Sequence, residues 1–75
     1  MSDDTHIAAE QWIAAFAASL GVDPPDAGTA DALLALAGVA AHASERPAAP
    51  IAAYLVGRAG IDATTALERA EEISP

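Results

Sequence analysis

Alanine is the feature that most constrains what this chain of 75 residues can fold into. Apolar residues make up 53% of the sequence, and more than half of them are alanine. Alanine strongly favours helix and lets helices approach closely, yet each methyl group buries little surface. A chain of this length forms one domain and buries only about 60% of its unfolded surface. We therefore expect residues 1–75 to be a single helical domain with a thin core.

Four helices are predicted from capping residues, terminators and apolar spacing. They run from Thr5 to Leu20, from Thr29 to about Glu45 or Arg46, from Pro50 to Gly60 and from Ala63 to about Ile73. The expected N-caps are Asp4 or Thr5, Thr29 and Asp62, and the expected terminators are Gly21 and Gly60. No period-2 alternation indicates a strand. The predicted fold is all-α, a small bundle of four short antiparallel helices with the second helix in its centre.

The charge of the chain restricts its partners. Three basic residues oppose eleven acidic ones, giving a net charge of −8. Such a surface repels phosphate backbones and anionic membranes, so we expect neither nucleic acid nor membrane as a partner. The longest uncharged stretch, from Ala32 to Ser44, is well short of the ~20 residues of a membrane span. Asp3 and Asp4 stand where a secretory signal needs basic residues, which predicts a cytoplasmic protein.

The residues that enzymes use for catalysis are missing or far apart. Without cysteine the chain forms no disulfide and has no thiol nucleophile. It also lacks a glycine-rich phosphate loop and a zinc-protease pattern. His6 and Glu10 are one turn apart, but a solvated helix face explains them more simply than a metal site. We expect no enzyme activity, no cofactor and no metal.

An acyl carrier protein is one alternative that the size and acidity of the chain raise. Carrier proteins need a serine in an Asp-Ser-Leu sequence at the start of their second helix. Here the matching residues are Asp31-Ala32-Leu33. The hydroxyl that would carry phosphopantetheine is absent, which argues against this function.

The segment from His42 to Pro50 is the candidate binding site. We expect His42 and Arg46 one turn apart at the end of the second helix. They have a structural interpretation, in which both cations stabilise the helix dipole and Arg46 pairs with Glu10. They also have a functional one, in which guanidinium and imidazole bind a carboxylate or phosphate of a partner. Tyr54 is a candidate neighbour, although a core position is the simpler interpretation of this aromatic residue.

Several segments together resemble one known family. They are Leu20–Asp23, Asp31–Ala37, Ala41-His42, Glu45–Pro50 and Tyr54–Gly57, with Trp12 in the first helix. This pattern resembles a small actinobacterial domain of unknown function, found alone or attached to molybdenum cofactor guanylyltransferase, the enzyme that joins molybdopterin to GMP. The resemblance covers about residues 10–60. The chain differs in having Ala52 and Ala53 where the family often has threonine, and in a shorter segment after Gly60.

The resemblance implies a non-catalytic accessory module in molybdenum cofactor maturation. Its partner would be the guanylyltransferase or a molybdoenzyme that receives the cofactor, and His42, Arg46 and Tyr54 would form the contact. Two alternatives stay open. In one, His42 and Arg46 bind a small anionic ligand such as a nucleotide phosphate. In the other, the chain is a structural homodimer that covers leftover apolar surface.

Overall fold

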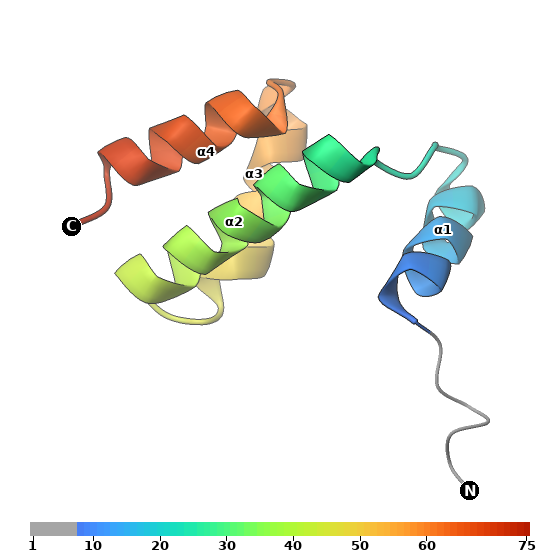
Figure 1. The fold of residues 1–75 in the computed structure, drawn as a ribbon, viewed down its shortest axis with the longest axis horizontal. Helices are drawn as coiled ribbons and strands as arrows, with labels where there is room; N and C mark the ends of the chain where they lie inside the picture. The colour runs from blue at the N-terminus through green and yellow to red at the C-terminus, as the bar shows by residue number, and fades with distance from the viewer. Residues whose placement is uncertain (1–7) are drawn as a thin grey trace, which may run out of the picture.

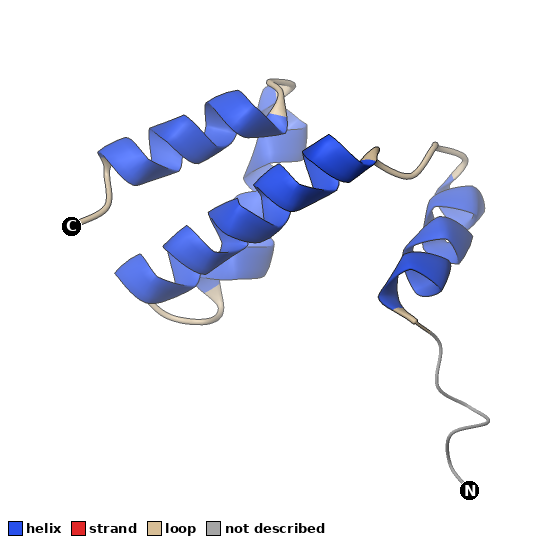
Figure 2. Cartoon of the chain, in the orientation of Figure 1, coloured by secondary structure: helices blue, strands red, loops and turns tan. Residues whose placement is uncertain are grey.

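A computed structural model describes residues 8–75 and shows four helices. They are α1 (Ala9–Leu20), α2 (Ala27–Ala43), α3 (Ala48–Ala59) and α4 (Ala63–Glu72) (Figure 1). This part of the chain contains no strand (Figure 2). The predicted all-α bundle of four short helices is confirmed. The expected helix start at Thr5 and its caps Asp4 and Thr5 lie outside the described residues, as does His6.

The packed unit consists of α2, α3 and α4. Helix α2 packs against both α3 and α4, as its apolar faces predict. Leu36 of α2 is the most buried large side chain, with 3% of its surface exposed, and Ala63 and Ala66 of α4 are each 5% exposed. Alanine at these positions lets the helix backbones approach closely but adds little buried area. The core is therefore as thin as the composition predicts.

Helix α1 stands apart from the other three helices (Figure 1). Its Ile13 and Ala14 lie beside the two prolines of the connector, Pro24 and Pro25, around a cavity of about 290 Å³. Helix α1 does not run back along α2 (Figure 1), so the predicted antiparallel arrangement of all four helices is not confirmed. Glu10 lines the same cavity, at the N-terminal end of α2. Its predicted pairing with Arg46, which follows the other end of α2, is therefore wrong.

The first residue of α2 differs from the prediction. Asp26, not Thr29, is the N-cap, and the Thr29 amide donates a hydrogen bond of 2.7 Å to its Oδ1 atom. Asp26 has the extended backbone that an N-cap requires. Thr29 is thus already the third residue of the helix.

The ends of α2 and α3 also shift relative to the prediction. Helix α2 ends at Ala43 rather than near Glu45 or Arg46, and Ser44 is its C-cap. Helix α3 begins at Ala48 rather than at Pro50. Pro50 fits inside the first turn because amides there have no acceptor within the helix, so its missing N–H costs nothing.

Two glycines and one aspartate behave as predicted. Gly21 and Gly60 end α1 and α3 with positive φ angles of 76° and 71°, a conformation that favours glycine. Asp62 is the N-cap of α4, and its Oδ1 accepts a 2.7 Å hydrogen bond from the Thr65 amide.

Acid destabilises this protein through its two N-caps. The backbone amides of Thr29 and Thr65 lower the pKa of Asp26 and Asp62 from the ordinary value of 3.8. A carboxyl whose folded pKa is lowered stabilises the fold above its unfolded pKa and loses that effect as pH falls through the folded value. We expect melting temperature to fall below about pH 4 more steeply in the wild type than in the double variant Asp26→Asn, Asp62→Asn, which keeps a capping oxygen but does not titrate. Thermal melts from pH 7 to pH 2 test this, and equal slopes would contradict it.

Candidate functional site

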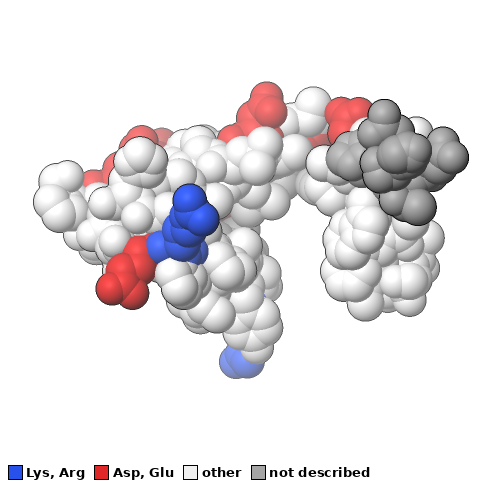
Figure 3. Space-filling model, turned by 90° about the horizontal axis from the view of Figure 1, so that it is seen from below, with Lys and Arg blue, Asp and Glu red and all other residues white. Residues whose placement is uncertain are grey.

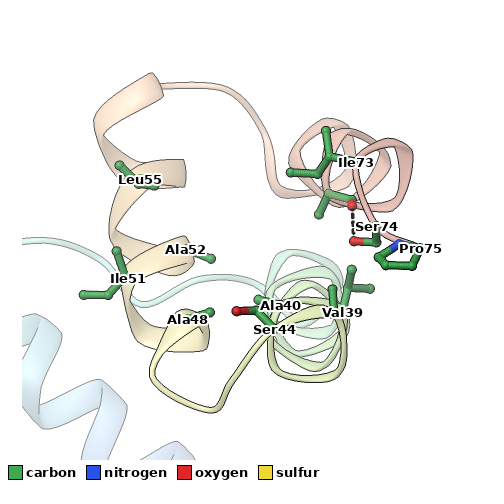
Figure 4. A pocket seen from close by; sticks show the side chains of 12 residues that line it. Val39, Ala40, Ser44, Ala48, Ile51, Ala52, Leu55, Ile73, Ser74 and Pro75 are labelled. Atoms are coloured by element: carbon green, nitrogen blue, oxygen red, sulfur yellow. Dashed lines mark hydrogen bonds between the residues drawn. The ribbon is translucent and has the colours of Figure 1, made fainter.

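An open groove lies between α3 and α4, with the C-terminal half of α2 as its floor (Figure 4). Its volume is about 560 Å³. The groove exists because α2 contacts both neighbours while α3 and α4 diverge from the turn at Gly60 (Figure 1). The residues that line it are Val39, Ala40, Ala43, Ser44, Ala48, Ile51, Ala52, Leu55, Ala70, Ile73, Ser74 and Pro75.

The lining of the groove is almost entirely apolar. Ile51 and Leu55 of α3 are 60% and 57% exposed, and Ile73 after α4 is 87% exposed. Its two hydroxyl side chains belong to Ser44 and Ser74, and the Ser74 hydroxyl donates a 2.6 Å hydrogen bond to the Ala70 carbonyl (Figure 4). No charged side chain lines it. The groove is therefore suited to apolar side chains rather than to a nucleotide or a metal ion.

The predicted site residues His42 and Arg46 lie within two positions, in the sequence, of residues that line this groove. His42 is exposed in the last turn of α2 and lines a smaller cavity of about 210 Å³ with Val39, Ser74 and Pro75. Arg46 lies in the link between Ser44 and Ala48, both of which line the groove. The expected one-turn spacing between His42 and Arg46 is wrong, because α2 ends at Ala43 and the chain leaves the helical path there.

Tyr54 is exposed on α3 and lies outside the groove lining. It is 59% exposed, so it is not a core residue. Its hydroxyl accepts a 3.3 Å hydrogen bond from Nη1 of Arg58, one turn further along the helix. The structure therefore pairs Tyr54 with Arg58 and does not bring it into a cavity with His42. A binding role for His42, Arg46 or Tyr54 stays a prediction.

A second apolar surface covers one face of α1. Trp12 and Phe16 stack with ring centroids 5.0 Å apart, and Ile13 and Leu20 continue the same face. The four side chains are 43–59% exposed. Their helical spacing predicts an apolar face, and amphipathic helices normally cover such a face with the rest of the core. The sequence contains no signal that this face is left open.

Charged side chains avoid these apolar surfaces. In Figure 3 the lower part of the right-hand lobe, which contains α1, is white, and acidic side chains lie mainly along the upper edge of the view, some beside the grey residues. Glu10 is the one charged residue of α1. Burial of the α1 face against another apolar surface would therefore bury no charge, which removes the largest cost of such a contact.

In residues 8–75, no group of three or more histidine, aspartate and glutamate side chains gathers in a way that could hold a metal ion. Among the helices described, none combines the length and apolar character needed to cross a bilayer.

The fold and the groove define a small all-α domain with an open apolar groove. Its sequence matches the family described as "Domain of unknown function (DUF6457)" over residues 4–74, so the chain belongs to that family. This confirms the resemblance to a domain of unknown function. Neither a curated protein nor a solved structure matches the chain.

Proposed function

We propose that this chain is a non-catalytic protein-binding module. The observation that carries the proposal is the pair of open apolar surfaces, the groove between α3 and α4 and the face of α1. Monomeric soluble proteins seldom leave large apolar side chains exposed in contiguous groups, and such groups mark sites for protein partners. A groove between helices is the usual receptor for an amphipathic helix.

The biological partner that we propose is molybdenum cofactor guanylyltransferase or a molybdoenzyme that receives the cofactor. The resemblance of the segment from His42 to Pro50 supports this partner. His42 lines the small cavity beside Val39 and Ser74, and Arg46 lies in the link between the groove residues Ser44 and Ala48. There the two side chains would bind carboxylates of the partner while apolar contacts form in the groove. Tyr54, beside Arg58, would add a contact on the outer side of α3.

Calorimetry of the purified chain with the guanylyltransferase tests this proposal. We expect micromolar or tighter binding, weakened about tenfold by Arg46→Ala because a charge-assisted hydrogen bond is lost. Arg69→Ala is the matched control, since Arg69 is equally exposed but lies on α4. Both variants should melt at the wild-type temperature. Absence of binding to the guanylyltransferase and to a cofactor-receiving apoenzyme would refute the proposed partner, and equal effects of both variants would refute the role of Arg46.

A further inference from the structure

We infer that the groove between α3 and α4 binds helix α1 of a second copy of this chain, so that two copies exchange their first helices. The inference rests on the proposed function, because it names the protein that the groove binds. Four observations support it: complementary chemistry, matching length, the position of α1 in its own chain and the amount of exposed surface.

The two surfaces have matching chemistry. The groove offers Ile51, Leu55 and Ile73 with no charged lining side chain. The α1 face offers Trp12 and Phe16 with no charge on that face. Within residues 8–75 no other segment covers either surface, and each supplies the apolar side chains that the other would contact.

The lengths also agree. Helix α1 has 12 residues, and so has α3, which forms one wall of the groove. At about 1.5 Å per residue, both helices are about 18 Å long. An α1 docked in the groove would therefore lie along the whole of α3. It would add a fourth helix to the packed unit of α2, α3 and α4.

The chain holds its own α1 away from its own groove. Ile13 and Ala14 lie against Pro24, Pro25 and the first turn of α2, and the neighbouring Ala17 is 6% exposed. The groove is formed at the opposite end of α2, by Val39, Ala43 and Ser44. The two prolines restrict the backbone of the connector, so a fold-back of α1 onto its own groove would break these contacts. A second copy can fill the groove without breaking them.

Large apolar side chains are exposed on both surfaces. Four on the α1 face (Trp12, Ile13, Phe16 and Leu20) and three in the groove (Ile51, Leu55 and Ile73) are 43–87% exposed. In a dimer of this kind, both sets would be covered in each of the two copies. A two-fold axis would form the contact twice, which suits a closed dimer.

Sedimentation equilibrium of the full chain tests the inference. We choose about 0.15 M salt because it largely screens the repulsion between two chains of charge −8. We expect a dimer in the micromolar range. Phe16→Asp places a carboxylate on the α1 face, and Leu55→Asp places one in the groove. Each alone should raise the dissociation constant of the dimer about thirtyfold or more. Leu34→Asp is the control, because Leu34 is 72% exposed on α2 outside the groove.

Mixing the two variants identifies the contact. The Leu55→Asp chain keeps its α1 face and the Phe16→Asp chain keeps its groove, so a heterodimer keeps one of the two contacts intact. The mixture should therefore associate more tightly than either variant does with itself. Trp12 is the one tryptophan of the chain and is 53% exposed, so its emission should shift to shorter wavelength on dimerisation. Loss of dimer by Phe16→Asp but not by Leu55→Asp would overturn the inference in favour of paired α1 helices.

A wild-type chain that stays monomeric at 100-fold above the micromolar range would also overturn it. The proposed function would still hold in that case if Arg46→Ala weakens binding to the guanylyltransferase. The two experiments therefore test the exchange of α1 and the proposed partner independently.

Discussion

Leu36→Ala is expected to unfold most of the protein at room temperature. Leu36 is 3% exposed in the centre of α2, the helix that packs against both α3 and α4. Truncation of a buried leucine to alanine costs about 2–5 kcal/mol, because transfer energy is lost and a cavity remains. A single core in a domain of this size seldom supplies more than about 3–5 kcal/mol. One substitution can therefore remove most of the stability.

The matched control is Leu34→Ala in the same helix. Leu34 is 72% exposed, so the same change of side chain removes little buried area there. Circular dichroism at 222 nm and a thermal melt of both variants at one protein concentration provide the comparison. A Leu36→Ala variant that melts within a few degrees of Leu34→Ala would show that the core does not depend on Leu36.

The elements that sequence predicted correctly are those decided by local chemistry. Gly60 ends α3 and Asp62 caps α4 because a left-handed residue and a capping carboxylate need only their own neighbours in the chain. The start of α2 was missed because Asp26 and Thr29 both cap helices well. The choice between them depends on where the backbone leaves the extended conformation after Pro25.

The arrangement of the helices could not be predicted in the same way. The spacing of Trp12 and Phe16 identifies an apolar face, but it contains no information on which surface covers that face. The groove is likewise invisible in sequence, because Ile51 and Leu55 have the spacing of ordinary core residues. Whether such residues are covered depends on the path of the connector at Pro24 and Pro25.

The candidate site was predicted only in part. Sequence placed His42 and Arg46 close together at the end of the second helix; His42 lies in its last turn and Arg46 in the link that follows. Their exact spacing was wrong because Ala43 ends the helix earlier than Pro47 requires. Steric restriction by proline gives the last position at which a helix can end, not the position at which it does end.

The second large effect is expected from a larger side chain in the core, where Leu36→Ala makes a side chain smaller. Ala66 of α4 is 5% exposed in the helix that packs against α2. Ala66→Leu adds three carbon atoms where a methyl group already fills the space, so α4 must move away from α2 or adopt strained rotamers. Overpacking of this kind costs about 1–3 kcal/mol, or roughly 5–20 °C in melting temperature for a domain of this size.

The same movement would open the groove, because α4 forms one of its walls. Ala66→Leu should therefore lower both the melting temperature and the affinity for whatever fills the groove, whereas Leu55→Asp should lower affinity alone. Ala35→Leu is the control: Ala35 is exposed on α2, and leucine there keeps helix propensity without crowding a neighbour. Equal melting temperatures of Ala66→Leu and Ala35→Leu would show that α4 is not closely packed against α2 at Ala66. Close approach of the two helices through alanine would then not be needed for stability.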